Sequence, residues 1–178
     1  MTTLVNDLVY FADRNKARLP LQYQNVDIHA LVNSIYQSFE DNARQKNLSF
    51  IADFETLHGI TLRTDPVRLR QIANNLIVNA LRYTHNGAVT LTASIVEINN
   101  KKLLQLCISD TGQGIAKEMQ QHIFAAAVTT GDALEALADQ PGLGLGLGLS
   151  IVSDLTNLLG GTIDLELSLI HISEPTRR

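Results

Sequence analysis

Two asparagines lie four positions apart in the segment TDPVRLRQIANNLIVNALRYT, residues 64–84. If this segment is helical, Asn75 and Asn79 point the same way. Arg82 follows one turn beyond Asn79, with Tyr83 beside it. A carboxamide oxygen is a hard ligand that Mg²⁺ accepts together with phosphate oxygens, and a guanidinium matches phosphate geometry. The pattern predicts a face that binds a metal–phosphate complex, although two such asparagines can also satisfy backbone groups in a packed layer.

A second polar group stands at the end of an apolar, strand-like segment. Asp110 opens the motif DTGQGI, residues 110–115, and Gly112 and Gly114 follow it. A carboxylate at a strand tip can accept a hydrogen bond from an exocyclic amine, and glycines let a planar ring approach the backbone. The motif taken alone is also a common turn. Beside the asparagine face, it favours a nucleotide site.

The run GLGLGLGLS, residues 142–150, leads directly into a predicted helix over Leu149–Leu159. Glycine inside a regular element costs about 0.5–1 kcal/mol relative to alanine, so four at alternate positions need a reason. Free N–H groups and the helix dipole favour a phosphate at such a helix start. A flexible linker would favour serine over leucine. The run therefore indicates a loop that wraps an anion.

Hydrophobic periodicity predicts the elements that must hold these three groups. Helices are expected over residues 26–46, 64–84 and 149–159, with Asp27 and Asp65 as N-caps. A helix end is also expected over residues 1–19, and a short helix ending at Ile123–Phe124. Strands are expected over residues 48–54, 88–98, 102–109 and 162–167, with a tight turn at Asn99–Asn100. Helices and mainly antiparallel strands segregated in this way predict an α+β, two-layer domain.

Composition excludes several classes of protein. The 178 residues carry a net charge of −4 with scattered Lys and Arg, which argues against a nucleic-acid partner. There is no secretory signal and no apolar run of about 18 residues that could span a membrane. The single cysteine, Cys107, is expected to be a small buried core residue in a reducing, cytoplasmic compartment.

Taken in order, the motifs resemble the ATP-binding catalytic domain of two-component sensor histidine kinases, of the superfamily that includes gyrase, Hsp90 and MutL. They correspond to its N-box (DPVRLRQIANNLIVNALRYT), G1 box (DTGQGI), F-box (Ile123–Phe124) and G2 box (GLGLGLS). The resemblance covers residues 21–167. It implies a Bergerat-type two-layer α/β sandwich, with a mixed, mainly antiparallel sheet covered on one face by helices. It also implies ATP and Mg²⁺ as ligands.

The resemblance assigns roles to individual residues. Asn79 would be the Mg²⁺ ligand and Asn75 its companion near the phosphates. Arg82 would reach the phosphates, and these three residues form the catalytic set. Tyr83 would pack against adenine, and Asp110 would accept a hydrogen bond from the adenine amino group. The implied ATP-binding positions are Asn75, Asn79, Arg82, Tyr83, Asp110, Gly112, Gly114, Ile115, Gly144, Leu145, Gly146, Leu147, Gly148, Leu149 and Thr162.

The resemblance also divides the chain. Residues 1–20 would be the end of the second helix of a dimerisation hairpin with its linker. Residues 21–167 would be the catalytic domain, with a lid at about 125–141. Residues 168–178 do not resemble the family and are interpreted as a cloning-derived tail. The F-box also departs from the family, because AAAV follows Phe124 where a second aromatic is usual.

The implied function is that of a protein-histidine kinase in a phosphorelay. The domain would present the γ-phosphate of ATP to a histidine on a dimerisation domain, for onward transfer to an aspartate of a response-regulator receiver domain. That histidine, which the family follows at once with Glu or Asp, is not expected in this chain. The five histidines, none in that context, are His29, His58, His85, His122 and His171. The whole protein would be a homodimeric, membrane-anchored bacterial sensor, and this chain part of its cytoplasmic portion.

Asn75 separates two kinds of superfamily member. The ATP-hydrolysing members carry a glutamate at this position as the general base for water, and an asparagine cannot take a proton. Slow ATP hydrolysis is therefore expected. Two alternatives remain: an anti-sigma-type serine kinase of the same superfamily, and a switch in which bound nucleotide changes partner binding without chemistry. The helical segment before Pro20 argues against the first.

Overall fold

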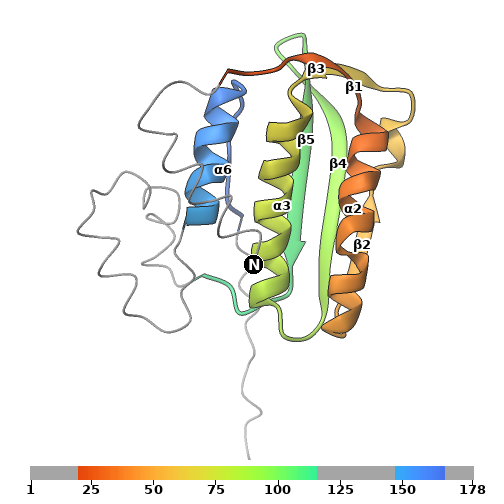
Figure 1. The fold of residues 1–178 in the computed structure, drawn as a ribbon, viewed down its shortest axis with the longest axis vertical. Helices are drawn as coiled ribbons and strands as arrows, with labels where there is room; N and C mark the ends of the chain where they lie inside the picture. The colour runs from red at the N-terminus through yellow and green to blue at the C-terminus, as the bar shows by residue number, and fades with distance from the viewer. Residues whose placement is uncertain (1–19, 116–146, 167–178) are drawn as a thin grey trace, which may run out of the picture.

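The computed structural model describes residues 20–115 and 147–166. Three helices form one layer and the larger of two sheets forms a second layer against it (Figure 1). The helices are α2 (Ile28–Gln45), α3 (Pro66–Tyr83) and α6 (Leu147–Leu158), with a short 3₁₀ helix η1 (Glu55–Leu57). The strands are β1 (Gln24–Asp27), β2 (Ser49–Asp53), β3 (Thr61–Thr64), β4 (Ala88–Ile98) and β5 (Lys101–Asp110). The predicted α+β, two-layer class is confirmed.

Helices α2 and α3 begin at the predicted N-caps. The Asp27 side chain accepts a hydrogen bond from Ala30 N at 2.9 Å. The Asp65 carboxylate accepts bonds from Val67 N and Arg68 N, and Pro66 occupies the first helical position. Both caps satisfy backbone donors that a helix start leaves unpaired.

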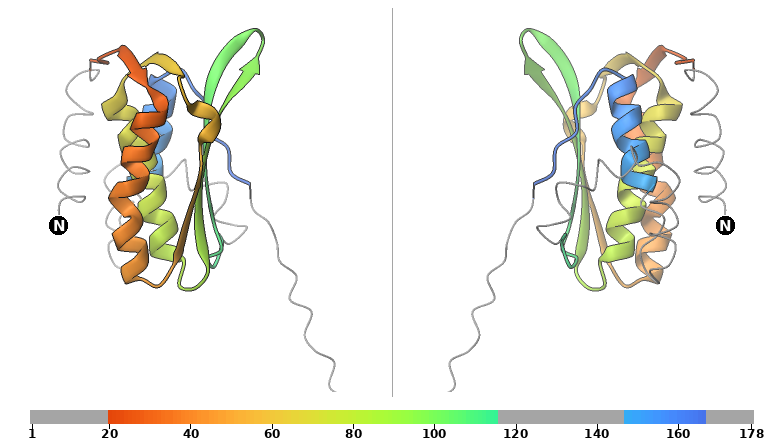
Figure 2. Two further views of the ribbon diagram at one scale, coloured as in Figure 1. Left: turned by 90° about the vertical axis from the view of Figure 1, so that its right-hand side faces the viewer. Right: turned by 90° about the vertical axis from the view of Figure 1, so that its left-hand side faces the viewer.

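The larger sheet has the order β2-β4-β5. β2 pairs with β4 in parallel, and β4 pairs with β5 antiparallel through the turn at Asn99–Asn100. Both turn residues have positive φ, 51° and 59°, which suits a tight hairpin. β1 and β3 form a separate antiparallel pair. Figure 2 shows the helices on one face of the larger sheet, as predicted.

Two hydrophobic clusters hold the layers together. The larger cluster joins α2 and α3 to the inner face of the sheet, with Ile28, Leu57, Ile77 and Leu91 fully buried at its centre. The smaller cluster joins α6 to α3 through Ile72, Ile151, Val152 and Leu155. In Figure 1, α3 lies between the other two helices and contributes to both clusters. Helix α6 is thus attached mainly through α3.

Four sequence-based predictions need correction. The strands β1 and β3 were not predicted, so the described residues hold two sheets rather than one. Helix α6 begins at Leu147, two residues earlier than predicted. The last strand was predicted over residues 162–167, but its described residues 162–166 form no ladder with the described strands, and Ile163 packs against the α6 cluster instead. Cys107 is exposed because Leu106 and Ile108 take the inward positions of β5.

Several other predictions lie outside the described residues. These are the helix end at residues 1–19, Ile123–Phe124, the lid at 125–141, the tail at 168–178, and the glycine-loop positions Gly144, Leu145 and Gly146.

Candidate functional site

The C-terminal end of α3 and the end of β5 meet at one end of the sandwich (Figure 1). Asp110, the last residue of β5, is held there by two donors. Gly112 N donates to Asp110 Oδ1 at 2.8 Å, and Thr84 Oγ1 donates to the same atom at 3.5 Å. Because the side chain is exposed and a carboxylate has about four acceptor positions, it can still accept a bond from a ligand.

Gly112 lies directly against the end of α3. A Cβ atom at this position would stand 2.6 Å from Tyr83 O and 2.7 Å from Asp110 Oδ1. Tyr83 O belongs to the backbone at the end of α3, so the position admits only glycine without a local shift. Gly112 thus brings the DTGQGI backbone close enough for its N–H group to orient the Asp110 carboxylate.

Thr111 ties the same segment to the turn between α3 and β4. Its hydroxyl accepts a hydrogen bond from Ala88 N at 3.0 Å and donates to Asn86 O at 3.2 Å. Its backbone N–H donates to Ala88 O at 3.1 Å. These bonds fix the loop on which Asp110 stands before any ligand arrives. Thr84 and Thr111 were not predicted as site residues from the sequence, although both are polar residues adjoining predicted site positions.

Asn75 and Asn79 lie one turn apart on the same side of α3. Asn75 is buried, and its Nδ2 has no hydrogen-bond partner among the described residues. Asn79 faces the start of α6, since a Cβ at Gly148 would lie 3.5 Å from Asn79 Nδ2 and 3.8 Å from Asn79 Oδ1. A buried amide without a partner costs about 1–3 kcal/mol. Such a group is most readily explained by a polar ligand.

Asn74, the neighbour of Asn75 on α3, also has a buried side-chain atom, Oδ1, without a hydrogen-bond partner among the described residues. Two adjacent amides on α3 therefore have an unused donor and an unused acceptor. The sequence alone could have indicated this role for Asn74, because asparagine is unfavourable in the middle of a helix and its presence there calls for a reason.

Arg82 and Tyr83 close the α3 end of the site. The guanidinium carbon of Arg82 lies 5.6 Å from the centre of the Tyr83 ring, within cation–π range. Arg82 is exposed and Tyr83 is half-buried. A cation and an aromatic plane thus stand together at the C-terminal end of α3.

The remaining predicted positions form the edges of the site. Gly114, with φ +70°, and the half-buried Ile115 continue the loop after Gly112. Gly148 and Leu149 lie in the first turn of α6, which begins at Leu147. Thr162 is exposed in the segment after α6.

The arrangement has a definite chemical polarity. One end offers neutral amides and a helix start, which suit phosphate oxygens and a metal ion bound to them. The Arg82 guanidinium, beside Tyr83, also suits phosphate oxygens. The other end offers a positioned carboxylate and an aromatic ring, which suit a base bearing an exocyclic amine. The two ends are joined by the last turns of α3. The residues therefore fit a nucleotide that spans the length of this surface.

Comparison with known proteins agrees with this chemistry. Residues 64–177 match the family described as histidine kinase-, DNA gyrase B-, and HSP90-like ATPase. This range extends beyond residue 167, where the sequence alone showed no likeness, and the domain boundaries stay a prediction.

Three curated relatives are sensor proteins. The chain is 31% identical over 160 residues to virulence sensor protein BvgS of Bordetella bronchiseptica, covering 90% of this chain and 13% of the relative. It is 32% identical to an aerobic respiration control sensor protein ArcB homologue of Haemophilus influenzae, covering 88% of this chain and 46% of the relative. It is 33% identical to sensor protein EvgS of Escherichia coli O157:H7, covering 82% of this chain and 12% of the relative. The chain spans less than half the length of each of these relatives.

Solved structures show the same likeness. ShkA in complex with AMPPNP has 33% identity and a TM-score of 0.70, covering 89% of this chain and 31% of that one. The Acinetobacter baumannii histidine kinase AdeS has 29% identity and a TM-score of 0.64, covering 90% of this chain and 68% of that one. Histidine kinase ThkA, solved in complex with response regulator protein TrrA, has 21% identity and a TM-score of 0.62, covering 89% of this chain and 41% of that one. At this identity the likeness is one of fold.

Proposed function

The chain belongs to the histidine kinase-, DNA gyrase B- and HSP90-like ATPase family, as an ATP-binding domain of the sensor histidine kinase type. From this premise we propose that it presents the γ-phosphate of Mg-ATP to a histidine on another domain. The observation that carries the proposal is the buried, unpartnered amide of Asn75 beside the Asn79–Gly148 contact. This pair of amides suits the phosphate end of the nucleotide.

The central residues of the site each have a part in this proposal. Asn79 holds the metal ion, and Asn75 Nδ2 donates to a phosphate oxygen. Arg82 reaches the phosphates, and Tyr83 packs against the adenine ring. Asp110 accepts a hydrogen bond from the adenine amino group, and Gly112 and Thr84 orient its carboxylate for that bond.

The site positions and neutralises the transferred group rather than attacking it. Bound Mg²⁺ would neutralise charge on the phosphate oxygens. Asn75 cannot accept a proton from water, so this position provides no general base for hydrolysis. The γ-phosphate is thereby kept for an external nucleophile, and slow hydrolysis follows.

The partners belong to the proposal as well. The nucleophile is a histidine on a dimerisation domain of the same kinase, and a response-regulator receiver domain accepts the phosphoryl group next. The complex of ThkA with TrrA supports this second step by analogy of fold. We assign residues 21–167 to the catalytic domain and residues 1–20 to the hairpin end and linker, in a homodimeric, membrane-anchored sensor whose cytoplasmic part includes this chain. No helix in the described part of the chain is long and apolar enough to cross a membrane.

A transfer experiment tests the proposal. The purified chain is incubated with γ-labelled Mg-ATP and a separately purified dimerisation hairpin that carries an acceptor histidine. Acid-labile label is expected on the hairpin, with little free phosphate released. Asn79→Ala should abolish transfer because the metal ligand is lost, while Asn42→Ala, at an exposed position of α2, should not affect it.

The other outcomes separate the alternatives. Binding of ATP without any label on the hairpin would support a nucleotide-dependent switch. Acid-stable label on a serine of a partner protein would support a serine kinase. Rapid ATP hydrolysis by the chain alone would contradict the role given to Asn75.

A further inference from the structure

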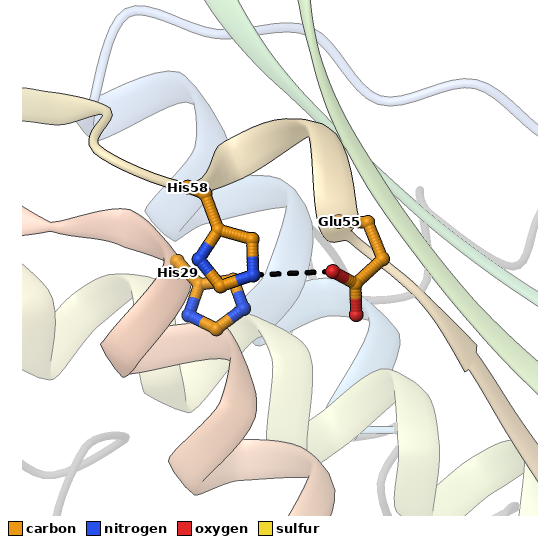
Figure 3. A group of neighbouring side chains, drawn as sticks. All are labelled: His29, Glu55 and His58. Atoms are coloured by element: carbon orange, nitrogen blue, oxygen red, sulfur yellow. Dashed lines mark hydrogen bonds and ion pairs between the residues drawn. The ribbon is translucent and has the colours of Figure 1, made fainter.

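Two histidines and a glutamate converge at the start of α2. His29 lies in the first turn of α2, Glu55 begins η1, and His58 follows η1. One ligand atom from each residue lies within 4.8 Å of the others. His58 Nε2 lies 3.1 Å from Glu55 Oε2, and the rings of His29 and His58 stack with centroids 3.6 Å apart. In Figure 3, one nitrogen of each ring lies on the side that faces the Glu55 carboxylate.

The backbone that carries these side chains is firmly held. Phe54 and Leu57 anchor η1 in the main core, with exposed fractions of 8% and 0%. Ile28, fully buried, anchors the start of α2, and its N–H donates to Ile60 O at 3.1 Å. Glu55 and His58 are three residues apart around a 3₁₀ turn, which places them on one side. The two segments are thus fixed relative to each other, while the ligand atoms stay accessible.

The cluster lies away from the nucleotide site. The N-terminal end of α2 stands at the opposite end of the helical layer from the C-terminal end of α3 (Figure 1). His29 is half-buried, and Glu55 and His58 are exposed, so water can complete a coordination sphere. The proposed phosphoryl transfer makes no use of these three residues.

We propose that His29, Glu55 and His58 form a binding site for a divalent transition-metal ion of the Zn²⁺ type. Two imidazoles and one carboxylate, with water in the fourth position, are a ligand set that Zn²⁺ takes in proteins. Tetrahedral Zn²⁺ holds its ligand atoms about 3.4 Å apart, so side-chain rotations are needed to bring the three ligand atoms from within 4.8 Å to that spacing. The two rings must turn out of their stack, because each nitrogen binds a metal in the plane of its ring.

The bound ion would clamp the start of α2 to the segment between β2 and β3. The helix dipole is positive at the first turn of α2 and opposes a cation there, while the Glu55 carboxylate offsets this effect. The expected affinity is therefore micromolar rather than tighter. A ligand that binds only the folded chain also raises the unfolding temperature.

A Zn²⁺ titration of the full chain tests the site. Isothermal calorimetry without nucleotide or chelating buffer should show one equivalent bound. His58→Ala and Glu55→Gln should each weaken binding about 10-fold or more, since even residues that only support metal ligands contribute this much. His85→Ala, at an exposed position after α3, is the matched control and should bind as the parent does. Zn²⁺ should also raise the unfolding midpoint of the parent but not of His58→Ala.

A second readout reports on the rings directly. In NMR spectra, the imidazole signals of His29 and His58 should shift together on adding Zn²⁺, while that of His85 should not. Absence of binding at micromolar Zn²⁺ would overturn the proposal. So would binding unchanged by His58→Ala and Glu55→Gln, or binding reduced equally by His85→Ala. Because ATP takes no part, these results do not depend on the outcome of the transfer experiment.

Discussion

Asp110 is oriented by its own neighbours before a ligand reaches it. Gly112 N–H and the Thr84 hydroxyl both donate to Oδ1, and the buried position of Thr84 keeps that hydroxyl away from bulk water. A bond from a ligand then costs little additional ordering of the carboxylate. This arrangement gives the single substitution Asp110→Asn an unusually clear consequence.

Asp110→Asn should weaken ATP binding about 10- to 100-fold, because it sets two donors against each other. The Gly112 and Thr84 donors will hold the asparagine oxygen inward, so its NH₂ group faces the adenine amino group. The guanine of GTP presents an oxygen at the corresponding position, and GTP should lose less affinity than ATP. Thr84→Val should cause a smaller loss for ATP, because Gly112 N–H remains. Fluorescent-nucleotide competition measures both ratios, and equal ATP binding by parent and Asp110→Asn would contradict the assignment.

At the scale of elements, the start of α6 serves both packing and the site. Gly148 lies inside the first turn of the helix rather than in the loop before it, with Asn79 against its backbone. Inside a helix, a glycine normally weakens stability relative to alanine. Its presence here is explained if the space beside Asn79 is needed for the ligand.

Gly148→Ala should therefore separate stability from binding. The free energy of unfolding should stay equal or rise by up to about 1 kcal/mol, because alanine is the better helix former and its Cβ meets Asn79 at ordinary contact distance. Mg-ATP affinity should fall, since the methyl group would stand against the Asn79 amide, the proposed metal ligand. Urea denaturation and nucleotide titration measure the two effects. Loss of stability together with loss of binding would show that Gly148 is structural only.

At the scale of the whole molecule, the two hydrophobic clusters suggest two levels of stability. Helix α6 is held by the smaller cluster of four buried residues, whereas α2, α3 and the sheet share the larger one. Local opening free energies follow the amount of apolar contact. The proposed nucleotide site includes residues of both α3 and α6, so a nucleotide bound there would bridge the two levels.

Amide hydrogen exchange should reveal this hierarchy. Without nucleotide, amides of α6 should exchange faster than those of α3 and β4, because α6 can open without disrupting the main core. Adding Mg-ATP should slow exchange in α6 most, since the ligand contacts both helices. Leu155→Ala should accelerate exchange in α6 while leaving β4 unchanged. Uniform exchange across the three elements, with or without nucleotide, would contradict the two-level description.

The sequence alone determined the main helices, the β4–β5 hairpin and much of the candidate site. Local physics was sufficient in each case: Asp27 and Asp65 are strong N-caps, Asn99–Asn100 suits positive φ, and apolar periodicity marks the buried faces. The polar face of α3 also followed from spacing, because Asn75 and Asn79 must share one side of a helix.

Only the tertiary structure decided the features that depend on distant partners. The pairing of β1 with β3 joins residues about forty positions apart, and β1 lacks the regular alternation of buried and exposed residues that would predict a strand. The support of Asp110 by Thr84, the contact of Gly148 with Asn79, and the meeting of His29 with Glu55 and His58 also require the packed chain. Local propensity acts over a few residues, whereas these contacts form only when the core closes and brings separate elements together.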